Sequence, residues 1–383
     1  VVVILAAGKG TRMGRADMAK VCFEIDSVPA IKRSVETFKR KGFGKFLVVV
    51  GSKAEQVMGV LSEEHPDVVY VCQEPQLGTG HAAKIAAESL KGMGFSGNVL
   101  VTMGDKYVEP MAIEALTEGF VKQQADMAML VIPKTRMSGG SGGRVLLDKT
   151  GQALDIIETI DLAKAKILEK LSKKIEKKSE VKGKEVLELI GKHIAKEKKQ
   201  RAAMETLVKL AQENVKLSKK VLQEYLDGEE LGFKVGGREY LASEIERKCK
   251  TVNPSLYLFK CGAFYDGVSW INNNNAQGEY YLTDVVRSLS EVKSKGGDGE
   301  YKVRTVGIDN PEWIQGFNSP DELIAIQDYV IKQREKGAAK VGFESKCLLK
   351  SNQYCSVKRW IEKIESGGKG VERWFKKIYG EHA

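Results

Sequence analysis

Short apolar runs alternate with amphipathic stretches over residues 1–160 of this 383-residue chain. Each short apolar run predicts a buried strand, and each stretch with apolar residues at helical spacing predicts a helix. The predicted strands are Val1–Leu5, Phe46–Val50, Val68–Cys72, Val99–Met103 and Ala128–Ile132. The predicted helices are Ile31–Arg40, Ala54–Ser62, Gly80–Leu90 and Met111–Gln123. This alternation indicates an α/β fold with a mostly parallel, Rossmann-like sheet flanked by helices, whose ligands bind beyond the carboxyl ends of the strands.

The pattern changes after Asp161, where Lys, Glu, Leu and Ala dominate and apolar residues recur at helical spacing. Examples are Ile167, Leu168, Leu171, Ile175, Val208, Leu210, Val215 and Leu217. Two or three helices packed as a hairpin are therefore predicted. The α/β texture resumes with predicted strands at Ser255–Phe259 and Tyr301–Val306, and a helix is expected from Pro320 onward.

Four segments follow from these patterns. Residues 1–160 and 251–318 form two parts of one core, residues 161–250 form a Lys-rich helical insertion, and residues 319–383 form a helical C-terminal extension. Within that extension, residues 335–383 are basic and predict a small helical cap.

Composition and charge exclude several classes of protein. Hydrophobic content of 42% is ordinary, and no apolar run is long enough to cross a bilayer. Six scattered cysteines without zinc-ligand spacing favour free thiols and a cytoplasmic protein. The net charge of +10 lies largely on the lysines of the insertion, which fits a solvated helix face better than a nucleic-acid site. Nucleic acid and membrane partners are therefore not predicted.

The loop after the first strand carries the sharpest chemical signal. Its sequence runs Leu5-Ala-Ala-Gly-Lys-Gly-Thr-Arg-Met13, and its small residues let backbone N–H groups approach phosphate oxygens. A dinucleotide loop would have glycine in place of Met13, and a Walker A loop would have serine or threonine in place of Gly10. Arg12 and Lys20 add two cations that suit a polyphosphate. Alone, this segment would also fit a tight turn with surface cations.

Five motifs in order resemble those of sugar-1-phosphate nucleotidyltransferases. They are the glycine loop with Lys20, Gln73-Glu-Pro-Gln-Leu-Gly-Thr-Gly-His-Ala82, Gly104-Asp105, Gly142-Gly-Arg144 with Glu158, and Asn273-Asn-Asn-Ala-Gln-Gly-Glu-Tyr-Tyr-Leu-Thr-Asp284. The chain is most similar to the uridylyltransferase domain of bacterial N-acetylglucosamine-1-phosphate uridylyltransferases, over residues 1–160 and 251–318. The resemblance implies transfer of a uridylyl group from UTP to a sugar 1-phosphate, first of all N-acetylglucosamine 1-phosphate, with release of pyrophosphate.

The resemblance also assigns roles by position. Arg12 and Lys20 would be catalytic cations, Asp105 and Asn275 would bind Mg²⁺, and the remaining residues would bind substrate. The nucleotide contacts implied are Leu5, Ala6, Ala7, Gly8, Gly10, Thr11, Gln73, Gly78 and Thr79. The sugar contacts implied are Gly143, Glu158 and Asn253.

Departures from the family pattern leave the sugar open. Ala19 replaces a proline before Lys20, Met103 replaces an aromatic residue before Asp105, and Asn253-Pro-Ser255 replaces Asn-Thr-Gly. No hexapeptide repeat is present, so neither the left-handed β-helix nor acetyl transfer is predicted. The alternatives are glucose 1-phosphate or another sugar phosphate with UTP or another nucleotide, and a non-catalytic nucleotide-binding regulatory protein. The oligomeric state also stays open, with the insertion as a candidate for self-association.

Overall fold

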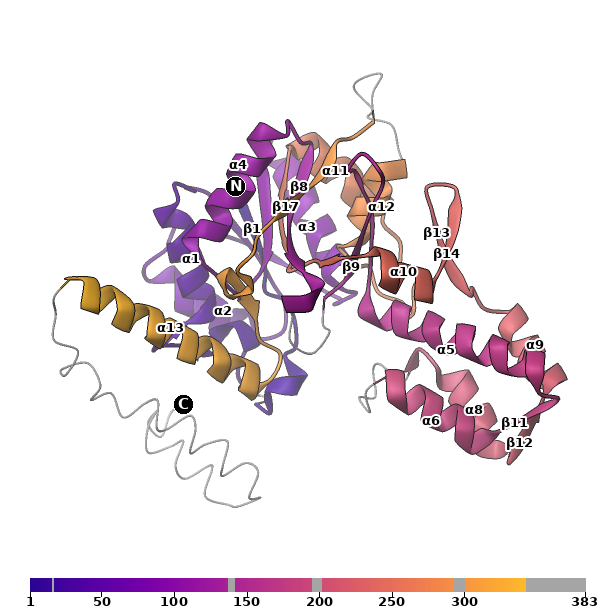
Figure 1. Cartoon of the computed structure of the whole chain (residues 1–383). Helices are drawn as coiled ribbons and strands as arrows, with labels where there is room; N and C mark the ends of the chain where they lie inside the picture. The colour runs from indigo at the N-terminus through magenta and orange to yellow at the C-terminus, as the bar shows by residue number, and fades with distance from the viewer. Residues whose placement is uncertain (16, 137–141, 195–201, 292–299, 342–383) are drawn as a thin grey trace, which may run out of the picture.

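A central sheet organises the computed structural model, which describes residues 1–15, 17–136, 142–194, 202–291 and 300–341, with side chains to residue 335 (Figure 1). Its strand order is β10-β9-β15-β8-β16-β6-β1-β4-β5, and β17 pairs with β8. The strands are β1 (Val2–Leu5), β4 (Phe46–Val50), β5 (Val69–Cys72), β6 (Val99–Met103), β8 (Met127–Pro133), β9 (Arg144–Leu147), β10 (Ala153–Ile157), β15 (Thr251–Val252), β16 (Leu256–Phe259) and β17 (Val303–Gly307). The predicted α/β fold is confirmed.

Strand direction differs between the two halves of the sheet. Strands β6, β1, β4 and β5 are parallel neighbours, whereas β16 runs antiparallel to both β6 and β8. At the opposite edge, β15, β9 and β10 pair in antiparallel fashion. The glycine loop therefore leaves the parallel half, where strand ends and helix starts converge at one edge.

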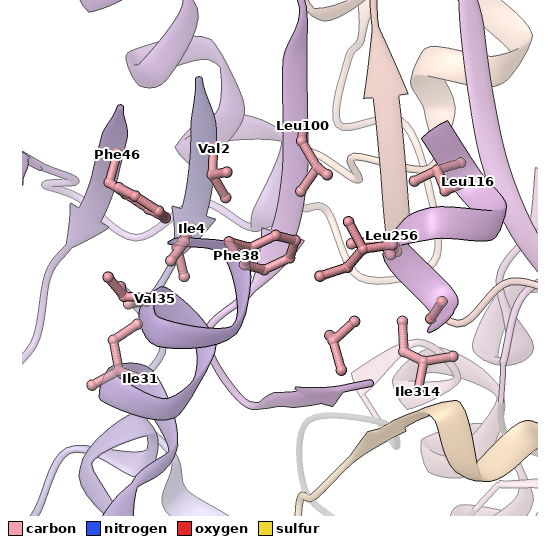
Figure 2. Close-up of a cluster of buried hydrophobic side chains, with 14 of the residues drawn as sticks. Val2, Ile4, Ile31, Val35, Phe38, Phe46, Leu100, Leu116, Leu256 and Ile314 are labelled. Atoms are coloured by element: carbon pink, nitrogen blue, oxygen red, sulfur yellow. The ribbon is translucent and has the colours of Figure 1, made fainter. Parts of the chain in front are cut away.

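Helices cover both faces of the sheet. On β1, Val2 and Ile4 face α1 (Ala30–Arg40), α2 (Ala54–Ser62) and α4 (Pro110–Lys122). Val3 and Leu5 face α3 (Thr79–Gly92), α11 (Cys261–Trp270) and α12 (Asp284–Glu291), because successive residues of a strand point to opposite faces. Figure 2 shows side chains of α1 and β1 meeting in the first of these clusters.

The insertion contains strands as well as helices. Its elements are α5 (Thr159–Lys177), β11 (Glu180–Lys182), α6 (Gly183–His193), α8 (Glu205–Glu213), β12 (Lys216–Ser218), α9 (Lys219–Asp227), β13 (Gly232–Val235), β14 (Arg238–Leu241) and α10 (Ala242–Lys248). The simple helical hairpin expected from the sequence is therefore wrong. Strands β11 and β12 pair in antiparallel fashion with Val181 opposite Leu217, and both side chains are buried.

A separate hydrophobic cluster lies inside the insertion. Ile167, Leu168, Leu171 and Ile175 of α5 are buried there, as their helical spacing predicts. Val215 differs, since it lies between α8 and β12 and its side chain is 87% exposed. Figure 1 shows α5 leaving the core, with α6, α8 and α9 gathered along its outer part and α10 beside its start.

Two small strand pairs complete the core. Strand β7 (Lys106–Val108) pairs with β18 (Ile314–Gly316), and β2 (Glu24–Ile25) pairs with β3 (Val28–Pro29). Helix α13 (Pro320–Val341) then begins near Pro320, as the sequence predicts. The cap expected at residues 335–383 lies almost wholly outside the residues described. Within the described chain, no helix has the length and apolar character needed to span a membrane.

Two helical glycines predict opposite effects of substitution by alanine. At Gly119 in α4, a Cβ atom would lie 2.4 Å from Cγ2 of Val306 in β17, whereas at Gly59 in α2 nothing lies within 4 Å. Gly119→Ala should destabilise the protein by about 1–3 kcal/mol through overpacking. Gly59→Ala should stabilise it by about 0.5–1 kcal/mol through helix propensity. Urea denaturation of the two variants measures both, and equal effects would contradict the packing of α4 on β17.

Candidate functional site

A cavity of about 860 Å³ lies at the carboxyl ends of β1 and β6. Most residues assigned from the sequence line it: Leu5, Ala6, Ala7, Gly8, Gly10, Thr11, Arg12, Lys20, Gln73, Gly78, Thr79, Asp105 and Glu158. Gly143, Asn253 and Asn275 are not among the lining residues. The lining also includes residues that the sequence does not predict, among them Lys106, Ser255, Tyr257, Glu279 and Asn318.

The glycine loop folds closely over Lys20. Gly10 has φ +62°, which favours glycine, and a Cβ atom there would lie 2.6 Å from Cβ of Lys20. Any other residue would push the loop away from that lysine. Gly10 therefore allows the backbone of the loop and the Lys20 side chain to share one wall of the cavity.

Gln73 lines the cavity directly after the end of β5. Its side chain is buried, and its amide Nε2 donates to the Gly78 carbonyl at 2.9 Å and lies 3.2 Å from Nδ1 of His81. In the described part of the chain, its Oε1 has no hydrogen-bond partner. An oriented amide oxygen that still lacks a donor can accept a hydrogen bond from a base N–H group.

A buried carboxylate lies between the cations. Lys20 Nζ forms a salt bridge with Asp105 Oδ2, and it also donates to Asn318 Oδ1 at 2.9 Å. Arg12 donates to the same Asn318 oxygen at 2.9 Å. Burial raises the pKa of Asp105, but the charges of Lys20 and Lys106 outweigh it and hold this pKa below its ordinary value. The group is therefore an anion at neutral pH.

The second oxygen of Asp105 makes this site suitable for a metal ion. Asp105 Oδ1 is buried and has no hydrogen-bond partner among the described residues. A buried carboxylate oxygen without a hydrogen-bond donor is rare, because its desolvation is unfavourable. A hard cation such as Mg²⁺ prefers a carboxylate oxygen as a ligand. Asn318 Oδ1 reaches the same Lys20 ammonium, so the two side chains offer oxygens on one side of the cavity.

Asn275 lies elsewhere, which corrects the pairing inferred from the sequence. Its Oδ1 accepts hydrogen bonds from the backbone N–H groups of Gln277 and Glu279, at 3.1 and 3.3 Å, and its amide donates to the Glu279 carbonyl. The side chain thus closes its own loop, and the structure does not bring it to Asp105. Its effect on the cavity is indirect, because Gln277 and Glu279 line the wall.

Asn318 is a candidate site residue that the sequence does not single out. It follows β18, whose Gly316 pairs with Lys106, the residue after Asp105. Its backbone N–H donates to Glu322 of α13, which fixes the turn into that helix. In the sequence, Asn318 is only a polar residue between Gly316 and the start of a helix. The long-range pairing of β7 with β18 is what places Asn318 beside Asp105.

The other end of the cavity carries acids. Glu158 precedes α5, and its Oε1 accepts a hydrogen bond from Thr283 Oγ1 at 2.8 Å. Burial, followed by the charges of Asp161 and Asp155, raises the pKa of Glu158, while the Thr283 hydrogen bond opposes the shift. This carboxyl can accept hydrogen bonds from the hydroxyl groups of a neutral ligand.

Gly143 and Asn253 do not line the cavity, but they contact residues close to its wall. A Cβ atom on Gly143 would lie 2.4 Å from Cγ2 of Ile156, so a side chain there would displace strand β10. Asn253 is buried, and its amide donates to the Tyr257 hydroxyl at 2.6 Å. Its backbone N–H donates to the Gly143 carbonyl. These residues position Tyr257, which does line the cavity.

A buried charge network lies behind Glu158. Asp155 is fully buried and pairs with Arg287, whose Nε donates to Oδ2 at 2.9 Å. Nearby, burial and then the charge of Asp155 raise the pKa of Asp284 to about 7, although Arg287 opposes the shift. Asp161 and Glu158 add to the same effect. Asp284 therefore titrates near neutral pH.

Asp284 should make stability fall as the pH rises. Because its pKa in the folded state is above its ordinary value of 3.8, the folded protein binds more protons than the unfolded chain between about pH 4 and pH 7. Asp284→Asn should gain about 2–3 kcal/mol more over wild type at pH 8 than at pH 5. Urea denaturation at both pH values measures this, with the exposed Asp227→Asn as control. A gain that did not change with pH would contradict the assignment.

Comparisons with known proteins agree with this geometry. The family profile of the MobA-like NTP transferase domain matches residues 2–213. The bifunctional protein GlmU of Cellvibrio japonicus is 38% identical over 345 residues, which are 89% of this chain and 54% of that protein. GlmU of Geotalea daltonii is 25% identical over 288 residues, 75% of this chain and 44% of that protein. The chain thus spans about half the length of these curated relatives.

A solved structure shares the fold. It is a Bacillus anthracis protein assigned as a glucose-1-phosphate thymidylyltransferase, in complex with sucrose. The TM-score is 0.50 at 12% identity, over 86% of this chain and 94% of that one. The motif resemblance found in the sequence is confirmed by these matches, and the chain belongs to the MobA-like NTP transferase family.

Proposed function

We propose that this protein transfers a uridylyl group from UTP to a sugar 1-phosphate, with N-acetylglucosamine 1-phosphate as the first candidate, and releases pyrophosphate. One observation carries the proposal: a single cavity of about 860 Å³ joins a glycine loop with two cations, an oriented amide at Gln73 and a buried carboxyl at Glu158. This volume lies within the range of small-molecule sites. A nucleotide and a sugar phosphate are the substrates that use all of these groups.

The nucleotide would lie along the parallel half of the sheet. Oε1 of Gln73, left without a donor, would accept a hydrogen bond from N3–H of uracil. The backbone N–H groups of the loop from Gly8 to Thr11 would contact the triphosphate, whose charge Arg12 and Lys20 would offset. This orientation places the α-phosphate between the loop and Asp105.

Asp105 and Asn318 would hold Mg²⁺. The support is the buried Asp105 Oδ1 without a hydrogen-bond partner and the shared contact of both side chains with Lys20. When bound, the ion would offset negative charge on the phosphates. Asn318 here replaces Asn275, whose oxygen is already used within its own loop.

The chemistry needs no general base. A phosphate oxygen of the sugar 1-phosphate, already an anion, would form the bond to the α-phosphorus of UTP while the bond to the pyrophosphate oxygen breaks. The residues of this chain would contribute by alignment and by neutralising the charge of the leaving pyrophosphate. Arg12 and Lys20 suit the second task, since both reach Asn318 at the phosphate end.

Glucose 1-phosphate is the second candidate, and Ser255 favours it. This residue lines the cavity at the position where the resembled family has glycine, and its φ of +69° lies in the region that favours glycine. Its side chain therefore takes up room beside Tyr257 at the sugar end. A smaller sugar without an acetamido group would be less affected by that side chain.

A substrate panel tests the proposed function. Purified protein with Mg²⁺ should release pyrophosphate from UTP faster than from CTP, dTTP or ATP. The second substrates are N-acetylglucosamine 1-phosphate, glucose 1-phosphate and glucosamine 1-phosphate. The expected maximum is UTP with N-acetylglucosamine 1-phosphate, and a maximum with glucose 1-phosphate would select the second candidate. Nucleotide binding without pyrophosphate release from any pair would instead indicate a non-catalytic regulatory protein.

Substitution of the two asparagines distinguishes the metal pairs. Asn318→Ala and Asp105→Ala should each lower pyrophosphate release about a hundredfold or more, because both remove an oxygen proposed to bind the ion. Both should also weaken the binding of Mn²⁺, used as a paramagnetic substitute and measured by electron paramagnetic resonance. Asn275→Ala should leave Mn²⁺ binding unchanged. Loss of Mn²⁺ binding in Asn275→Ala but not in Asn318→Ala would restore the pairing inferred from the sequence.

A further inference from the structure

Lys106 is a further cation that lines the cavity, together with Lys9, Arg12 and Lys20. Its side chain lines the wall, yet in the described part of the chain its ammonium forms no hydrogen bond or salt bridge. Arg12 donates to Asn318 and Lys20 bonds both Asn318 and Asp105, whereas Lys9 is exposed on the glycine loop and Lys106 is half-buried. The Lys106 ammonium thus lies near Asp105 without an acceptor of its own in the part of the chain that the structure describes.

The fold makes room for this side chain. Lys106 begins β7 and lies opposite Gly316 of β18 in antiparallel register. A Cβ atom at Gly316 would lie 2.6 Å from Nζ of Lys106 and 3.1 Å from its Cε. The lysine therefore lies directly over the glycine, and any other residue at position 316 would force it out of this position.

The charge of Lys106 is poorly compensated. Asp105 and Glu322 are the acids whose charges act on it. Asp105 already pairs with Lys20, and Glu322 accepts the backbone N–H of Asn318. The Lys106 ammonium has no acceptor of its own among the described residues, so a purely structural role as a counter-charge explains its place in the cavity poorly. An anion that enters the cavity would supply the missing partner.

We infer that Lys106 binds a phosphate oxygen of the substrates, as a phosphate-binding cation on β7 beside Arg12 and Lys20. The inference rests on the proposed function and adds a residue to that site. The ligand is a phosphate group, which either the nucleoside triphosphate or the sugar 1-phosphate can provide. If Asp105 and Asn318 bind a metal ion, the ammonium of Lys106 on β7 is still available to bind a phosphate oxygen.

Three variants test this role. Lys106→Met removes the charge and keeps an extended apolar chain, and Lys106→Arg keeps the charge. Lys122→Met removes a lysine from an exposed position at the end of α4 and serves as the control. Thermal unfolding establishes that each variant is folded before binding is measured.

Binding to the whole protein gives the decisive measurements. Isothermal titration with pyrophosphate in the presence of Mg²⁺ tests the nucleotide side, and titration with N-acetylglucosamine 1-phosphate tests the sugar side. Lys106→Met should weaken at least one of them about tenfold or more, Lys106→Arg should recover part of the loss, and Lys122→Met should match wild type. The weakened ligand identifies which phosphate Lys106 contacts.

Metal binding separates a phosphate contact from a structural effect. Without substrate, Lys106→Met should bind Mn²⁺ at least as tightly as wild type, because a positive charge near Asp105 has been removed. Unchanged binding of both phosphate ligands in Lys106→Met would overturn the inference. So would a parallel loss of Mn²⁺ binding, since Lys106 would then act only by holding Asp105. These titrations do not need turnover, so they remain decisive even if wild type fails the substrate panel.

Discussion

The ammonium of Lys20 is the contact on which the geometry of the cavity depends. It bonds Asp105 at the end of β6 and Asn318 after β18, residues 85 and 298 positions away in the sequence. A buried carboxylate without a cation would be protonated or excluded from the interior. By pairing with Asp105 and Asn318, Lys20 joins the ends of two strands, β6 and β18, that lie far apart in the sequence. The glycine loop follows, because Gly10 packs directly on the stem of Lys20.

The sequence predicts those parts of the site that depend on neighbouring residues. The loop around Gly10 and the strand end before Asp105 are local features, and both line the cavity as expected. The position of Asn318 near Asp105 depends instead on the pairing of Lys106 with Gly316, which brings together segments more than two hundred residues apart. No local pattern encodes that register. Asn275 and Asn318 both lie in polar segments that precede a helix, so the sequence offers no physical reason to prefer the second.

In the insertion, too, the elements that depend on long-range packing could not be predicted from the sequence. The helical spacing of Ile167 to Ile175 predicts α5 correctly, since one face of a helix must be buried over several turns. Strands β11 and β12 have three residues each, too few to show an alternating pattern. They form because Val181 and Leu217 fill the same hydrophobic cluster from opposite strands. Pairing of this kind is a property of the assembled fold.

The cavity has ends of opposite charge, and this polarity bears on how the proposed substrates would lie in it. Lys9, Arg12, Lys20 and Lys106 line the end at the glycine loop, and Glu158 lines the end at Thr283. Further acids lie behind the second end: Asp155, Asp161 and Asp284. Phosphate groups would be attracted to the cationic end and repelled from the acidic one before any specific hydrogen bond forms. The acidic end suits neutral hydroxyl groups, which donate to these carboxyl groups, whereas a further carboxylate would be disfavoured by the same burial and neighbouring acids that raise the pKa of Glu158. The orientation of the substrates and the exclusion of acidic sugars would thus have the same electrostatic cause.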